Sequence, residues 1–214
     1  MAGAANVLED GSLLSQLDRK LYKLEGFMAL ISGLAIFSLM ILAVVSVGGR
    51  NTMNMPLPGY VDWIEQVMPL IAFMGVAYTQ RDGAHIRMDI LVGKLRGRAL
   101  WGAEFITTFA MLTLVALLIW GSYSHFLRSF DFNVPYFSRD SSIDILIPLW
   151  PAKLLVPVAF SVLSLRLMVQ LVGYGRAFVL GLVEPIAVPL VMSAAAQAAE
   201  EAEHVTGLND EGNV

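Results

Sequence analysis

The chain has 214 residues, of which 57% are hydrophobic and only 15% are charged, with a formal net charge of −4 and no cysteine. A soluble domain carries nearer a quarter charged residues, so this composition predicts an all-α integral membrane protein. The lack of cysteine excludes disulfides, thiol catalysis and iron–sulfur clusters. The basic residues collect at expected membrane boundaries and give no stripe that would bind nucleic acid.

The first 25 residues are expected to lie in the cytoplasm or on the membrane surface. Their length and acidic residues are untypical of a cleavable signal. From residue 13 onward, leucines recur at three- and four-residue steps between charged residues. This pattern predicts an amphipathic interfacial helix, with an ordinary solvated lead-in as the alternative.

Four stretches with few charges are long enough to cross a hydrocarbon core of ~30 Å as helices. We predict a four-span membrane domain over residues 26–175, with spans at about 26–48, 61–80, 101–127 and 149–173. A basic segment at about 83–98 follows the second span and has one apolar side. It is expected to form a second amphipathic helix at the interface.

Residues 176–214 are apolar at first and acidic towards the end. Glu184, Pro185 and Pro189 interrupt the apolar part. This favours a membrane-adjacent helix and an acidic cytoplasmic tail, although a fifth span is the alternative.

The distribution of Lys and Arg predicts the orientation. The N-terminal segment and the segment 81–98 carry more basic residues than the loops 49–60 and 128–149. Because basic segments stay in the cytoplasm, we expect cytoplasmic termini and place both loops on the outer side.

The sequence does not support haem, metal or nucleotide chemistry. His85 and His125 are expected at opposite ends of their spans, whereas a haem held by two histidines needs both at one depth. No HExxH or P-loop string occurs. We therefore expect no catalytic residue, no metal ligand and no cofactor.

The charges close to the span ends suggest contacts between helices. We predict an outer pair between Glu65 and Lys153. We also predict an inner pair between Glu104 and Arg166. The alternative is that each side chain extends to its own membrane interface.

The second span has one face of small or polar residues. Pro69 removes the helical partner of the Glu65 carbonyl, so we expect a bent or hydrated helix there. Ala72, Val76 and Thr79 share this face, which suits a protein contact better than a substrate site.

Arg81, His85 and Asp89 lie four residues apart at the end of the second span. They would form a ladder on one face if the helix continued, and would then anchor the helix exit at the cytoplasmic surface. A solvated basic loop with accidental spacing is the alternative.

The order of these features resembles a known family. Trp63-Ile64-Glu65 opens the second span, the string RDGAHIRMDIL starts at Arg81, and Ile147-Pro148-Leu149-Trp150 opens the fourth span. Over about residues 25–175 this order is similar to the small permease subunit, DctQ type, of tripartite ATP-independent periplasmic (TRAP) transporters. The R-x-G-x-H-I-x-x-D string is its most specific part.

The resemblance implies a multi-pass scaffold subunit of the bacterial inner membrane, surrounded by membrane lipids. It would support a large permease subunit of the DctM type, which carries the substrate and coupled sodium ions. A periplasmic binding protein of the DctP type would deliver an organic acid. From the topology, we expect the outer loops to help dock that protein, with Arg139 and Asp140 as candidates for polar contacts. A membrane anchor subunit of a redox enzyme and a stand-alone small transporter remain alternatives.

Overall fold

The structure is a computed structural model that describes residues 13–55, 57–81, 98–181 and 188. In this part of the chain the regular structure is helical, with two isolated bridges and no β-strand. The described fold is therefore all-α, as the composition predicts. His85, Asp89, nearly all of the expected helix at 83–98 and most of the segment 176–214 lie outside the described residues.

The first helix, α1 (Leu13–Met53), is 41 residues long and contains the expected span 26–48. It continues without a break through residue 25. The prediction of a separate surface helix is therefore wrong for residues 13–25, which form the first turns of the spanning helix. At 1.5 Å per residue α1 is about 60 Å long, which is twice the thickness of a hydrocarbon core.

The expected second span at 61–80 consists of two shorter helices, α2 (Tyr60–Met74) and α3 (Val76–Arg81). Gly75 separates them, and its backbone N–H bonds to the Phe73 carbonyl instead of continuing the α-helical pattern. Pro69 lies inside α2. The expected second span is therefore interrupted about one and a half turns before α3 ends at Arg81.

The last two long helices are α5 (Arg98–Ser129) and α6 (Trp150–Leu180). α5 contains the expected span 101–127, and α6 contains the expected span 149–173 except for Leu149, its N-cap residue. A short 3₁₀ turn, η1 (Pro135–Phe137), lies in the loop between them. α6 continues past its expected end at residue 173. It stops before Gly181, whose φ of +66° forms a left-handed C-cap.

Three helices of the described chain are long and apolar enough to cross a membrane, judged by length and composition. They are Leu14–Met53, Arg98–Ser129 and Trp150–Leu180. The predicted second span at 61–80 is not among them, because α2 and α3 are each too short to cross a membrane.

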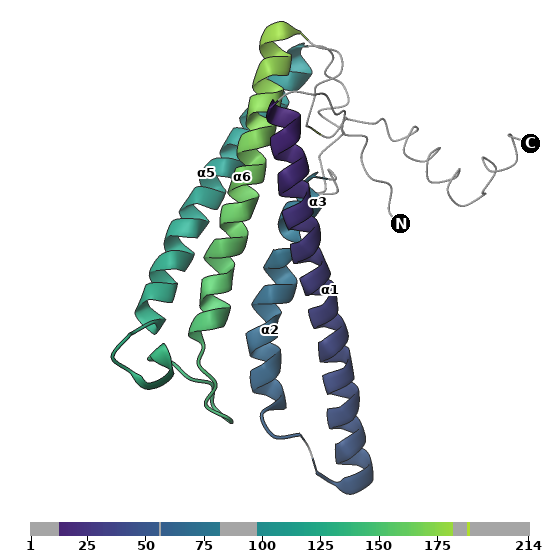
Figure 1. The fold of residues 1–214 in the computed structure, drawn as a ribbon, viewed down its shortest axis with the longest axis vertical. Helices are drawn as coiled ribbons and strands as arrows, with labels where there is room; N and C mark the ends of the chain where they lie inside the picture. Colours follow the sequence, from purple (N-terminus) through teal and green to yellow (C-terminus); the bar gives the residue numbers. More distant parts are fainter. Residues whose placement is uncertain (1–12, 56, 82–97, 182–187, 189–214) are drawn as a thin grey trace, which may run out of the picture.

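The helices form two pairs, α1 with α2 and α5 with α6, which converge at one end and diverge towards the other (Figure 1). The start of α1 and the end of α6 lie at the converging end. The loop between α5 and α6 and the turn before α2 lie at the diverging end, here called the outer end. The core between the helices is centred on Val115, Ala159, Val162, Leu163 and Leu167.

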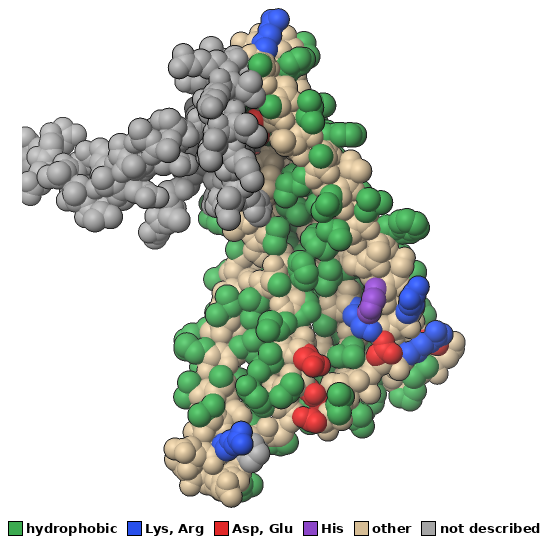
Figure 2. Space-filling view, turned by 180° about the vertical axis from the view of Figure 1, so that it is seen from behind, with side chains coloured by type: hydrophobic (Ala, Val, Ile, Leu, Met, Phe, Trp, Pro, Cys, Tyr) green, Lys and Arg blue, Asp and Glu red, His purple; other side chains and the backbone are tan. Residues whose placement is uncertain are grey.

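The outward surface of the helices is mostly apolar. Hydrophobic side chains cover much of the middle of the face shown in Figure 2, whereas charged side chains gather towards its lower, outer end. On α1, Phe27, Leu30, Leu34 and Met40 are each more than half exposed. Such a surface is suited to contact with lipid or with another membrane protein.

Candidate functional site

A fully buried arginine links the first and last helices at the converging end. Arg166 on α6 donates from Nε and Nη2 to the two carboxylate oxygens of Glu25 on α1, at 2.7 and 2.5 Å. Its Nη1 donates to the carboxylate of Asp18, which lies two turns earlier on α1. All three side chains are at most 1% exposed, so water is excluded from these ion pairs.

The same Asp18 also binds α3. Arg81 Nη2 donates to Asp18 Oδ2 at 3.0 Å, and the Arg81 guanidinium lies 4.0 Å from the centre of the Tyr22 ring. Tyr22 in turn stacks on Tyr78, with 5.8 Å between ring centres. Asp18, Glu25, Arg81 and Arg166 are here called the charge cluster.

The charge cluster contains equal numbers of acids and bases. An isolated buried ion would cost several kcal/mol even after relaxation, so mutual pairing is what makes burial possible. Next to the cluster, Gln80 Nε2 donates to Gln170 Oε1 at 2.9 Å, and Gln170 Nε2 donates to the Gln80 carbonyl at 3.2 Å. The arrangement is suited to fixing α1, α3 and α6 relative to one another.

The predicted inner pair between Glu104 and Arg166 is wrong, because Arg166 uses all of its nitrogens on Glu25 and Asp18. Glu104 is buried on α5. The sequence does not predict the roles of Asp18 and Glu25, because both lie within the first 25 residues, which are expected in the cytoplasm or on the membrane surface. Their spacing of seven residues, with Tyr22 between them, could have shown that they share one helical face.

A second polar site lies at the outer end, where the loop between α5 and α6 contacts the start of α2. The Asp62 carboxylate accepts hydrogen bonds from the Ser142 hydroxyl at 2.7 Å and from the backbone N–H groups of Ile145 at 2.8 Å and Asp144 at 3.0 Å. Asp62 is 3% exposed. Its carboxylate therefore organises the loop backbone in the way that an anion organises a nest of N–H groups.

Two further contacts hold this loop on α2. Gln66 Nε2 donates to the Pro148 carbonyl at 2.7 Å. Gly59, the residue before α2, has a φ of +69°, and a Cβ added there would lie 2.5 Å from Cδ1 of Ile145. Only glycine suits this close approach of the loop.

The predicted outer pair between Glu65 and Lys153 is also wrong. Lys153 Nζ bonds to Asp140 Oδ2 at 2.5 Å, so its partner comes from the loop and not from α2. This hydrogen bond is the main reason why the pKa of Asp140 lies below its ordinary value. Glu65 is exposed and has no ion-pair partner in the described part of the chain.

The other docking candidate, Arg139, also forms an ion pair within the loop. Its Nε and Nη2 donate to Asp131 Oδ2 at 3.0 and 2.7 Å. A backbone N–H of Asn133 and the Arg139 guanidinium together lower the pKa of Asp131. Arg139 remains 58% exposed at its side chain, so it can still contact a partner.

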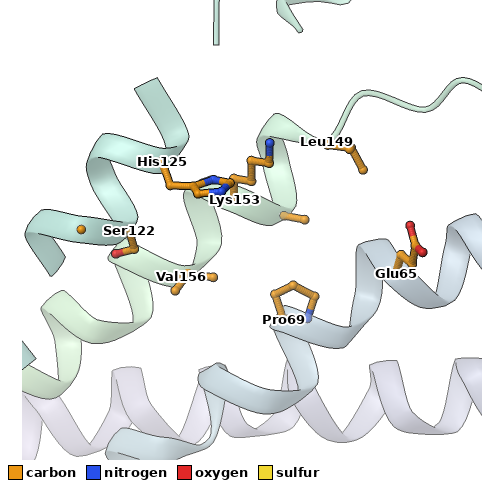
Figure 3. A pocket seen from close by; sticks show the side chains of 9 residues that line it. Glu65, Pro69, Ser122, His125, Leu149, Lys153 and Val156 are labelled. Atoms are coloured by element: carbon orange, nitrogen blue, oxygen red, sulfur yellow. The ribbon is translucent and has the colours of Figure 1, made fainter. Parts of the chain in front are cut away.

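A pocket of about 520 Å³ lies between α2, α5 and α6 at the outer end (Figure 3). Glu65 and Pro69 line it from α2, and Lys153 lines it from α6. The remaining lining residues are Gly121, Ser122, His125, Leu149, Ala152 and Val156. The two residues of the failed outer pair thus face the same space without bonding to each other.

A sequence comparison with protein families identifies the chain. The DctQ component of tripartite ATP-independent periplasmic transporters matches residues 39–175, which is more than half of the chain. The chain belongs to this family. As a DctQ protein it is of the small permease subunit type, and the family is a transporter component and not an enzyme family. The comparisons with curated proteins and with solved structures gave no match.

The DctQ match covers only part of the charge cluster. It includes Arg81 and Arg166 but begins at residue 39, after Asp18 and Glu25 on the same helix. The outer loop, the start of α2 and the whole pocket lie inside the matched range. Within the described residues, no group of three or more His, Asp or Glu is placed to hold a metal ion.

Proposed function

We propose that this DctQ protein is the membrane scaffold of a TRAP transporter. It supports the large DctM-type subunit during sodium-coupled uptake of an organic acid, which a periplasmic DctP-type protein delivers. The family match over residues 39–175 carries this proposal. The charge cluster supports it, because its carboxylates and guanidinium groups are joined to one another across helices.

The proposed topology has four crossings of the bacterial inner membrane. α2 and α3 together make the second crossing, despite the break at Gly75, with both termini in the cytoplasm. In support, the start of α1 and the end of α6 lie at the same end of the molecule in Figure 1. The excess of basic residues in the first and 81–98 segments favours a cytoplasmic position for that end.

The proposed contact with the large subunit uses the exposed side of α2 and α3. Ala72 and Thr79 are exposed there, and Pro69 and Val76 are half-buried. Small side chains allow the backbone of a neighbouring helix to approach closely, which is how membrane helices associate without a hydrophobic driving force. The outer loop is proposed to contact the binding protein, with Arg139 and Asp140 as its polar residues.

Reconstitution tests the scaffold function. The full chain is co-expressed with the large subunit and placed in proteoliposomes, with binding protein and organic acids supplied outside. We expect uptake only with both membrane subunits, the binding protein and an inward sodium gradient. Uptake by this chain alone would instead support a stand-alone transporter, and haem absorbance in the purified chain would support a redox anchor.

A further inference from the structure

The pocket between α2, α5 and α6 has a polar rim and an apolar interior. Glu65, His125 and Lys153 each lie within about one and a half turns of the outer end of their helix, where α2 starts at Tyr60, α5 ends at Ser129 and α6 starts at Trp150. Pro69, Gly121 and Val156 lie about one turn deeper along the same helices. In a membrane protein this places the rim at headgroup depth and the interior at the depth of the acyl chains.

The rim carries both signs of charge on opposite sides. In Figure 3, the Glu65 carboxylate projects from α2, while His125 and Lys153 project from α5 and α6 across the opening. Lys153 forms an ion pair with Asp140, which offsets its charge, but an ammonium group has three N–H donors, so this contact leaves donors for a further acceptor such as a phosphate oxygen. A group that carries a cation and an anion would complement this rim.

The size of the pocket suits part of a lipid molecule. The pocket offers about 520 Å³, which lies within the range of small-ligand sites. A headgroup, a glycerol unit and the beginning of an acyl chain fit a space of this size, which is typical of small-ligand sites.

We propose that this pocket binds one glycerophospholipid whose headgroup carries a phosphate and a primary ammonium group. The ammonium group pairs with Glu65, and the phosphate accepts hydrogen bonds from Lys153 and His125. The acyl chain enters the membrane along Pro69 and Val156. This lipid would fill part of the space between the two helix pairs at the outer end.

Native mass spectrometry of the purified full chain tests the proposal. Delipidated protein is titrated with phosphatidylethanolamine, phosphatidylglycerol and diacylglycerol that carry identical acyl chains. We expect phosphatidylethanolamine to bind about fivefold more tightly than phosphatidylglycerol, which corresponds to ~1 kcal/mol for one interfacial ion pair. Glu65→Gln should remove this preference. Equal binding of all three lipids would overturn the proposal.

Filling the pocket provides a second variant with a matched control. A Cβ added at Gly121 meets no atom within 4 Å, and the same holds for exposed Gly33 on α1. Gly121→Leu should therefore fold, place its side chain in the pocket and weaken phosphatidylethanolamine binding about fivefold or more. Gly33→Leu should bind the lipid as the wild type does.

Unchanged lipid binding in a folded Gly121→Leu protein would contradict the proposal. A cross-link between the Ala152→Cys variant and the large subunit in the co-expressed complex would also contradict it, if the bound lipid were lost at the same time. That result would show that a protein segment fills the pocket. The lipid titration uses the purified chain alone, so its result is independent of whether reconstituted uptake with the large subunit succeeds.

Discussion

Arg166 and Glu25 are joined by two parallel hydrogen bonds across the contact between α6 and α1, and neither side chain is exposed to solvent. A bidentate pair of this kind fixes both distance and orientation, because the guanidinium fork matches the two carboxylate oxygens. It therefore sets how the first and last helices lie relative to each other. The proposed role as a scaffold subunit requires such a fixed arrangement.

Removing Arg166 should strongly destabilise the protein. Arg166→Ala leaves Glu25 buried without its bidentate partner, and the loss from breaking a buried ion pair is about 3–5 kcal/mol. The free energy of unfolding in mixed micelles of detergent and SDS measures this loss. Arg176→Ala serves as the control, because Arg176 is exposed on the same helix and should cost little. Similar losses of unfolding free energy in both variants would show that the charge cluster does not stabilise the protein in particular.

Replacing both partners should be milder than replacing one. In Arg166→Met with Glu25→Met, no unpaired charge remains from this pair, and Asp18 keeps its ion pair with Arg81. We expect a coupling energy of about 1–3 kcal/mol in a double-mutant cycle, with the double variant more stable than Arg166→Met alone. Strictly additive losses would show that the two residues do not interact.

The contact between Gly59 and Ile145 gives a sharp backbone test. Gly59→Ala should destabilise the protein by about 1–2 kcal/mol, because alanine is strained at positive φ and its Cβ would clash with Ile145. Gly75→Ala is the matched control, since Gly75 has a φ of −84° and open space at its Cβ. Ile145→Ala should recover part of the loss at Gly59, because it removes the clash but not the strain. The melting temperature in detergent checks each variant.

Asp62 should control the order of the outer loop. Asp62→Ala removes the acceptor for the Ser142 hydroxyl and for the N–H groups of Asp144 and Ile145. Hydrogen exchange in residues 142–147 should then be at least about tenfold faster, because the loss of even one of these three charge-assisted hydrogen bonds is expected to have that effect. Asp144→Ala, at an exposed position, should leave the exchange unchanged. Equal exchange in both variants would mean that the loop is ordered by other contacts.

The outer loop should lose local stability in acid. Hydrogen bonds from Lys153 to Asp140, and from Asn133 and Arg139 to Asp131, hold both pKa values below the ordinary value of 3.8. Their contribution is therefore complete above the pKa of the unfolded chain and is lost as the pH falls through the lower folded pKa. Proteolysis or hydrogen exchange of residues 130–141 should rise over this acidic range. Asp131→Asn should reduce this pH dependence. If the pH profile stayed unchanged both in this variant and in Asp140→Asn, these two carboxylates would not be the cause of the loss of stability in acid.

The long helices could be predicted because uncharged runs of this length are suited to a bilayer. The expected spans at 26–48, 101–127 and 149–173 each lie essentially within one long helix. The break of the second span at Gly75 was missed, since a single glycine is often tolerated inside a helix.

The partners of the charged residues could not be predicted with the same success. The predicted ion pairs join only charged residues within the expected spans. The prediction therefore pairs Lys153 with Glu65, whereas its partner in the structure, Asp140, lies in the loop. Likewise, Arg166 was assigned to Glu104, because Glu25 had been placed at a membrane surface. Because α1 continues without a break through residue 25, Asp18 and Glu25 lie beside α6 and bond to Arg166, a contact between distant parts of the chain that local sequence patterns do not reveal.

The 141 positions that separate Glu25 from Arg166 bear on how the protein is made. At a synthesis rate of about 5–20 residues per second, Glu25 leaves the ribosome roughly 7–28 s before Arg166 does. Arg81 follows Asp18 by only 63 positions, so it can act as an early partner on the nascent chain. The first helix to enter the membrane therefore waits for the last one to be translated before its final neighbours are in place.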